Sequence, residues 1–440
     1  MFKTLFLNNR FFVAIGLVVI MLVLSFSLTA LLLFSQVLLG FVVLLLLLDI
    51  ALLYRQIAFE GRRETPQKLS NGDDNELFIH LQNKYVFPTS VIIHDELPFQ
   101  LQKRDVAFTA ELKPKAEITL SYKVRPVKRG DYHFGGINVM VSSPIGFASR
   151  RYVFSQDKVV PVYPSYIQLR KYDLRAIHNN LVDLGIKKIR RIGHNQEFEQ
   201  VNDYVFGDDV RTINWKATAR RNSLMVNHYQ DEKSQQIYSL IDKGRVMKMP
   251  FEGMSLMDYA INASLVISNV AIRKDDKAGL ITFNHKAGTS LKAAKTGNQM
   301  QHIMEVLFNQ KTSYKESDYE AMFLQVRKHI TQRSLLMLYT NFETVTSLER
   351  QMPYLRKLAT QHLLVVIFFE NTELHELTKQ PAHDVETVYQ KGLAEKLEMD
   401  KRRIVSELRT HGIYSVLTSP QNLTINTLNK YLELKARGLI

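Results

Sequence analysis

Residues 11–48 contain no charged side chain, and no other feature limits the fold of the chain as strongly. The apolar character continues to residue 54, and a helix through residues 11–54 would be about 66 Å long, whereas the hydrocarbon core of a bilayer is roughly 30 Å thick. One tilted span cannot absorb that length, and the run is too long for the apolar part of a secretory signal peptide. We therefore predict a transmembrane hairpin over residues 1–54, with two spans and a turn near residues 25–29 or at residues 35–36.

Cations flank this apolar run at both ends. Lys3 and Arg10 precede it, and Arg55, Arg62 and Arg63 follow it, whereas the expected turn contains none. Lys and Arg favour the cytoplasmic side of a membrane. We therefore expect a multi-pass protein of the cytoplasmic (inner) membrane, with both termini and the soluble domains in the cytoplasm.

The charge of the whole chain is compatible with this location. The chain has 440 residues, with 57 Lys and Arg against 43 Asp and Glu, so its formal net charge is +14. An anionic cytoplasmic leaflet attracts such cations. No zinc-finger spacing or glycine–aromatic RNA-binding motif is present, so no nucleic-acid partner is expected. The absence of cysteine excludes disulfides, Cys-ligated metal centres and a catalytic thiol.

Residues 65–165 carry the pattern of short β-strands. Residues 76–81 and 117–124 alternate between apolar and polar side chains, and turn signals such as Asn71-Gly72 separate the strand-like runs. No strong helical periodicity interrupts them. We expect a β-rich, sandwich-like domain here.

Residues 235–440 change to apolar strands that alternate with amphipathic helices. The strand-like runs are residues 237–241, 278–283, 335–339, 363–369 and 413–417, and helices are expected near residues 255–272, 298–309, 318–331 and 383–411. Continuous apolar strands separated by helices indicate a mostly parallel sheet that is covered on both faces. The sequence therefore predicts an α/β doubly wound domain.

The stretch between these two domains, residues 166–234, is expected to be a linker that carries a dense polar motif. Its ordered positions include Asn195, Glu197, Asp203, Tyr204, Gly207, Asp208, Asp209, Arg211, Asn214, Trp215, Lys216, Arg220 and Arg221. Together with residues 224–226 and Asp242-Lys243-Gly244, this run resembles the bacterial family known as domain of unknown function fifty-eight. The resemblance is close over residues 190–250 and loose over the α/β domain. It departs at Asn202, where the family usually has arginine.

The resemblance implies a von Willebrand factor A-like domain, membrane-anchored and associated with a MoxR-type AAA+ ATPase. The metal site of such domains uses an Asp-x-Ser-x-Ser turn, a threonine and a second aspartate. Asp242 matches the first aspartate, but Gly244 and Val246 replace the two serines, and Asn341 replaces the second aspartate. Mg²⁺ prefers six oxygen ligands and gains most from anionic ones. The expected metal site is therefore degenerate, with Asp242, Ser317, Asp318 and Thr340 at most, and no cofactor is expected.

The polar motif itself, which we call the family box, has two interpretations. If residues 210–221 form a helix, Asp208 or Asp209 caps its N-terminus, and Trp215 anchors its apolar stripe. The box is then a structural clasp that docks onto the sheet through Asp–Arg pairs. Alternatively, the box is a partner-binding surface. Its members are Glu197, Asp208, Asp209, Arg211, Asn214, Trp215, Lys216, Arg220 and Arg221.

Two functions therefore compete. The first is a membrane-tethered, non-enzymatic interaction module that presents a von Willebrand A-like domain to cytoplasmic partners. These would be a MoxR-type AAA+ ATPase, in complex assembly or chaperone-like work, and other von Willebrand A-domain proteins. The alternative is a metal-dependent hydrolase or phosphoryl-transfer enzyme that uses Asp208, Asp209 and Asp242. No phosphate-binding loop, nucleophile elbow or His-Glu-x-x-His motif occurs in the sequence, so we favour the interaction module.

Overall fold

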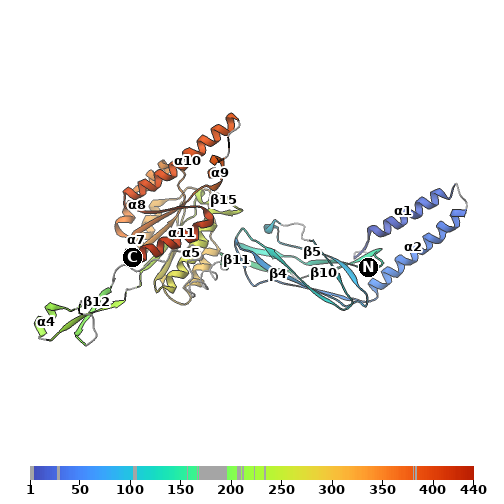
Figure 1. Cartoon of the computed structure of the whole chain (residues 1–440), viewed down its shortest axis with the longest axis horizontal. Helices are drawn as coiled ribbons and strands as arrows, with labels where there is room; N and C mark the ends of the chain where they lie inside the picture. Colours follow the sequence, from blue (N-terminus) through green and yellow to red (C-terminus); the bar gives the residue numbers. More distant parts are fainter. Residues whose placement is uncertain are drawn as a thin grey trace. The chain divides into compact units, whose positions relative to one another are not determined.

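The computed structural model describes all residues except 1–3, 27–29, 103–106, 156, 166, 168–195, 206–209, 211–212, 222, 232–233, 380 and 382–383. The chain divides into two compact units, Met1–Tyr163 and Pro164–Ile440 (Figure 1). Each unit has hydrophobic cores of its own.

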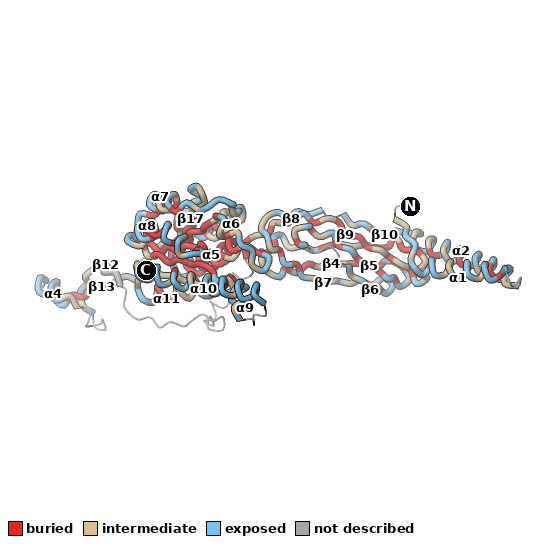
Figure 2. Tube along the Cα trace, turned by 90° about the horizontal axis from the view of Figure 1, so that it is seen from above, coloured by how far each residue is buried: buried red, intermediate tan, exposed pale blue. Residues whose placement is uncertain are grey.

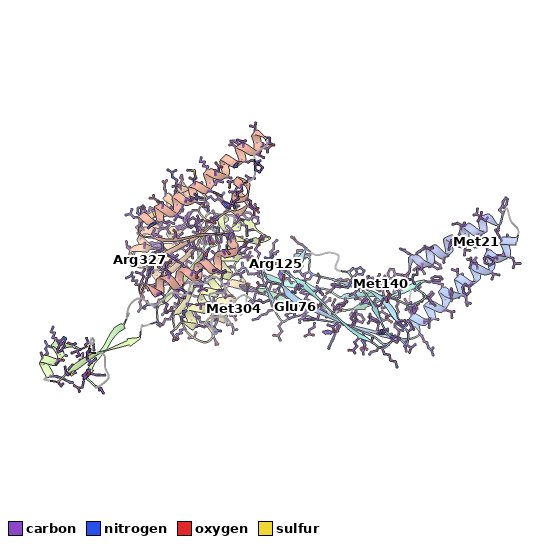
Figure 3. The ribbon with its side chains drawn as sticks, viewed as in Figure 1. Met21, Glu76, Arg125, Met140, Met304 and Arg327 are labelled. Atoms are coloured by element: carbon purple, nitrogen blue, oxygen red, sulfur yellow. The ribbon has the colours of Figure 1, made fainter. Side chains whose placement is uncertain are left out.

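The first unit begins with two apolar helices, α1 (Asn9–Leu24) and α2 (Ala30–Tyr54), which lie side by side in Figure 1. Residues Leu31–Tyr54 are long and apolar enough to cross a membrane, whereas α1 is a shorter apolar helix. Residues 27–29 of the expected turn lie outside the described residues, while α1 ends at Leu24 and α2 begins at Ala30. Met21 lies in the last turn of α1 (Figure 3). The other expected position was wrong, because Ser35 lies inside α2 and donates a hydrogen bond to the Leu32 carbonyl oxygen at 2.8 Å. A serine bonded in this way leaves the helix intact.

The remainder of the first unit is β-rich, as predicted. One sheet has the strand order β1-β10-β9-β5-β6, and two smaller sheets have the orders β2-β4-β7 and β3-β11-β8. Alternate residues of β4 and β5 are buried, and Leu81 and Ile93 from these strands join Val139 from β9 in one core. Two strands precede the expected boundary at residue 65. The strands are β1 (Leu5–Leu7), β2 (Phe59–Glu64), β3 (Leu69–Ser70), β4 (Asn75–Asn83), β5 (Thr89–Asp95), β6 (Ala107–Leu112), β7 (Glu117–Val124), β8 (Gly130–Phe134), β9 (Ile137–Ser142), β10 (Ala148–Phe154) and β11 (Lys158–Tyr163).

Asp49, on α2, joins the apolar helices to the β-sheet. Its side chain is fully buried. One carboxylate oxygen accepts hydrogen bonds from the backbone N–H groups of Phe147 and Ala148, each at 2.8 Å, and the other accepts from the Ser143 hydroxyl. Near the end of the same helix, the Arg150 guanidinium donates to the Leu53 carbonyl oxygen at 2.6 Å. Hydrogen bonds to an ionised group are stronger than those between neutral groups. The C-terminal end of α2 is therefore fixed to β10 and to the loop before it.

The second unit contains a six-stranded sheet with the order β18-β17-β14-β19-β20-β21. The sheet is parallel except for β18, which is antiparallel to β17. Helices α5 and α11 contribute to the core on one face, and α7, α8 and α10 contribute to the core on the other. Figure 2 shows the strands of this sheet as the most buried part of the unit. The predicted α/β architecture is therefore present.

The elements of this sheet follow the expected runs closely. The strands are β14 (Gln236–Asp242), β17 (Lys277–Phe283), β18 (Ala287–Ala294), β19 (Leu335–Tyr339), β20 (Leu363–Phe369) and β21 (Tyr414–Thr418). The helices are α5 (Leu256–Arg273), α6 (Gln299–Phe308), α7 (Tyr319–His329), α8 (Val345–Gln361), α9 (Thr372–Lys379), α10 (Val385–Thr410) and α11 (Leu423–Ala436). A short hairpin, β15 (Pro250–Phe251) and β16 (Met254–Ser255), precedes α5. Capping side chains fix several helix starts, including Ser255, Asp318, Thr344 and Asp384.

The described part of the expected linker contains an antiparallel hairpin and a short helix. Strands β12 (Gln196–Asp203) and β13 (Met225–Asp231) pair, and the short helix α4 (Trp215–Arg221) lies between them in the sequence. The Asn214 backbone N–H donates to the Met225 carbonyl oxygen at 2.8 Å, which ties the start of α4 to β13. The hairpin therefore organises the described part of the family box.

Candidate functional site

Asp242 ends β14 at the carboxyl edge of the parallel sheet, where α/β proteins generally bind their ligands. Its side chain is fully buried. One oxygen accepts from the Ser317 hydroxyl and from the Gly244 N–H at 2.8 Å, and the other accepts from the Thr340 hydroxyl at 2.8 Å. Burial raises the pKa of the carboxyl group, and the hydrogen bonds from Ser317, Gly244 and Thr340 oppose the rise. All these contacts tie neighbouring loops together.

Gly244 stands where the metal-binding motif has a serine, and the structure leaves no space for a side chain at this position. A Cβ atom built on Gly244 would lie 2.1 Å from the Ser317 hydroxyl oxygen, so a side chain at 244 and the observed position of Ser317 exclude each other. Ser317 therefore occupies the space that a serine in the motif would fill.

The residues at this edge do not fit a Mg²⁺ ion. Both oxygens of Asp242 already accept hydrogen bonds, and the Asn341 amide oxygen accepts from the Lys401 ammonium group at 2.6 Å. Asp318 caps α7 by accepting from the backbone N–H groups of Glu320 and Ala321 at 2.9 and 3.0 Å. Within the described part of the chain, no group of three or more His, Asp or Glu side chains could hold a metal ion. A hard cation needs several free oxygen donors, and this set offers few.

Lys401 is a charged residue at this edge that the sequence analysis missed. It lies on α10, and its ammonium group also donates to the Phe342 carbonyl oxygen. Burial lowers the pKa of Lys401 to about 8, while the nearby Glu343 and Glu370 oppose the shift. Helical periodicity places residue 401 on the same face as the buried Ile404 and Leu408, which is the signal that could have revealed it.

The described half of the family box is an exposed surface. Helix α4 is shorter than expected, and Asn214 caps it by accepting from the Ala217 N–H at 3.0 Å, in place of the expected Asp208 or Asp209. The Asn214 amide also donates to Asn227 at 2.8 Å. Trp215 is 70% exposed, so its expected role as a buried anchor was wrong. Because the helix begins only at residue 215, the indole lies on its open first turn.

The cations of the box share this exposure. Lys216, Arg220 and Arg221 are all exposed on α4, and we call these three residues and Trp215, which are distributed around this short helix, the α4 face. Glu197 lies in β12 opposite Gln230. Asp208, Asp209 and Arg211 lie outside the described residues. The structure therefore brings Asn214, Trp215, Lys216, Arg220 and Arg221 together on one short helix and its cap, and Asp242 contacts Ser317 and Thr340.

The region that contains both α4 and Asp242 matches a known protein family. Residues 200–407 match the family described as Protein of unknown function DUF58. The chain is also 29% identical over 198 residues to the uncharacterized protein YeaD of Bacillus subtilis, a match that covers 43% of this chain and 49% of that protein. The alignment thus spans about half the length of this curated relative.

Similar solved structures are distant. The conserved hypothetical protein BatB from Bacteroides thetaiotaomicron is 12% identical, covering 46% of this chain and 99% of that chain with a TM-score of 0.28. The ASH/PapD-like domain of human CEP192 is 14% identical, covering 24% of this chain and 87% of that chain with a TM-score of 0.19.

Proposed function

We propose that this protein is a membrane-tethered, non-enzymatic interaction module. In this proposal, α1 and α2 both span the cytoplasmic membrane, and both termini, the β-rich domain and the α/β domain lie in the cytoplasm. The α/β domain acts as a von Willebrand A-like module, and its partner is a MoxR-type AAA+ ATPase. The linker region that carries the family box supplies the contact surface.

The observation that carries the proposal is the α4 face. Trp215 is 70% exposed and is flanked on the same helix by exposed Lys216, Arg220 and Arg221. Trp and Arg are enriched among the residues that dominate binding energy at protein interfaces. Without a partner, the exposed indole leaves its apolar surface in contact with water, which does not stabilise the protein. An acidic partner surface with one apolar pocket fits this arrangement.

Two further features support a binding role. At the carboxyl edge of the sheet, Asp242 is buried and fully hydrogen-bonded, so it offers neither an open metal position nor a free base. At the other end of the chain, Asp49 and Arg150 fix the apolar helix to the β-rich domain. Such attachment suits a protein that holds a partner near a membrane.

The test combines a binding assay with a melting curve. The double variant Arg220→Gln/Arg221→Gln and the variant Trp215→Ala should lose capture of the ATPase from detergent-solubilised membranes. Their stability should change by no more than about 0.5 kcal/mol, because exposed positions contribute little. The matched control Arg403→Gln/Arg409→Gln removes two exposed cations from α10 and should retain the ATPase.

Unchanged capture by the α4 variants would contradict the proposal. A large loss of stability in Arg220→Gln would instead favour the structural clasp. For the orientation, protease added to intact spheroplasts should leave the soluble domains uncut, and cleavage there would reverse the topology.

A further inference from the structure

A second candidate surface lies beside Asp242 and its partners Ser317 and Thr340, at the carboxyl ends of β19 and β20. It is a groove of about 210 Å³ between the β15–β16 hairpin, α9 and α10. Its apolar lining includes Met249, Phe251, Leu374 and Leu397. Small-molecule sites usually have volumes of roughly 300–1,000 Å³. The groove therefore suits one large apolar side chain better than a cofactor.

The rim of this groove is acidic, in a chain with a net charge of +14. Glu343, Glu370 and Glu373 line it and are exposed. None of the three forms an ion pair with any side chain in the described ranges. The one cation of the lining, Lys401, lies near Glu343 and Glu370, and its ammonium group donates to Asn341 and Phe342, so the lining holds three carboxylates against one ammonium group. The groove as a whole thus attracts a cationic, apolar ligand.

The apolar surface continues from the groove along α10. Leu397 lines the groove, and Leu393, Tyr389 and Val385 precede it at intervals of four residues, with exposed fractions of 49%, 74% and 87%. Figure 1 shows α10 extending beyond the body of the sheet at its end nearer α9. Residues four apart are neighbours on a helix surface. The groove is thus the inner end of a longer exposed strip.

The α4 face has the complementary chemistry. It combines one exposed indole with three cations, Lys216, Arg220 and Arg221, while the groove combines an apolar pocket with three carboxylates. Opposite charges around an apolar centre give an interface both attraction and register. Both surfaces belong to the same chain and do not overlap.

We propose that the groove binds the α4 face of a second copy of this chain, with Trp215 in the pocket and the cations of α4 against Glu343, Glu370 and Glu373. The contact is head-to-tail, so it joins copies into rings or open rows on the membrane. The inference rests on the proposed function in one respect, which is that α4 is a binding surface. It adds that copies in a cluster have their α4 faces covered, and an ATPase would compete for them.

The experiment uses the full chain in nanodiscs, each holding one copy. Trp215 is the only tryptophan, so its emission reports on α4 alone. As the concentration of nanodiscs rises, the emission should shift to shorter wavelengths, because the indole leaves water. A shift that is already complete at the lowest concentration would show docking within one chain and would overturn the proposal. The absence of any shift would overturn it as well.

Charge reversal then identifies the surfaces. Glu370→Lys/Glu373→Lys should weaken self-association by about tenfold or more, as like charges then meet at the contact. Mixing this variant with Arg220→Glu/Arg221→Glu should restore association between unlike copies, measured by energy transfer between labels. The matched control Glu349→Lys, on an exposed part of α8, should leave self-association unchanged.

Lack of rescue in the mixture would overturn the proposed pairing. The same variants separate this inference from the proposed function. If self-association follows the charges but no ATPase is captured, only the proposed partner fails. If Glu370→Lys/Glu373→Lys associates as wild type while the α4 variants lose the ATPase, only the groove assignment fails.

Discussion

Asp49 and Asp242 are both completely buried, yet the two regions that hold them use these carboxylates differently. Asp49 accepts two backbone N–H bonds and one hydroxyl bond and joins an apolar helix to a β-sheet. Asp242 accepts one backbone N–H bond and two hydroxyl bonds and joins loops within one domain. Hydroxyl groups can rotate to other acceptors, whereas backbone N–H groups at a fixed loop cannot. The same residue type is therefore less replaceable at the base of the helix than at the edge of the sheet.

The largest effect is expected from Asp49→Leu. The substitution leaves the N–H groups of Phe147 and Ala148 buried without an acceptor, and each such donor costs about 1–3 kcal/mol. We expect the β-rich unit to lose about 3–5 kcal/mol of stability, measured by denaturant unfolding in detergent. Asp49→Asn keeps one acceptor oxygen and should lose less than half of that. Equal losses in both variants would show that charge rather than acceptor geometry matters at this position.

A smaller effect is expected from Asp242→Asn. Thr340 already shares a hydrogen bond with the Tyr319 hydroxyl at 2.6 Å, so its own hydroxyl has another partner. The Asn amide oxygen can still accept from the Gly244 N–H, and we expect a loss of about 1–2 kcal/mol in a melting experiment. A loss larger than that of Asp49→Leu would reverse the comparison between the two carboxylates.

Sequence patterns predicted the architecture of both regions better than their polar contacts. Strand runs such as residues 237–241 and 335–339 can be recognised from the sequence, because a buried parallel strand must be apolar on both faces. Asp49 and Lys401 escaped notice because each is one polar residue in a helix, and its partners come from distant segments. Trp215 was placed wrongly, because a helix expected from residue 210 begins only at residue 215.

The pH dependence of the free energy of unfolding tests the environment of Lys401 at the edge of the sheet. Burial lowers its pKa to about 8, whereas the pKa of an unfolded lysine is about 10.4. Between these values the unfolded chain binds more protons than the folded chain, so the contribution of Lys401 to the free energy of unfolding rises with pH. Urea unfolding of the full chain at pH 7.5 and 9.5 should show this rise, and Lys401→Met should reduce it. An identical pH profile in the variant would assign the rise to other groups.

The smallest effect is expected from adding a divalent cation. A Mg²⁺ ion at the sheet edge would have to displace the hydrogen bonds of Ser317 and Thr340 to Asp242, and it would gain only one carboxylate in return. Asn341 cannot compensate, because its amide oxygen is bonded to the Lys401 ammonium group, whose charge also repels a cation. Calorimetric titration of the full chain with Mg²⁺ or Mn²⁺ should therefore show no binding tighter than about 1 mM, and the melting temperature should not change. Micromolar binding that Asp242→Ala abolishes would contradict this expectation. It would also show that a metal can replace the hydroxyl bonds of Ser317 and Thr340 to Asp242.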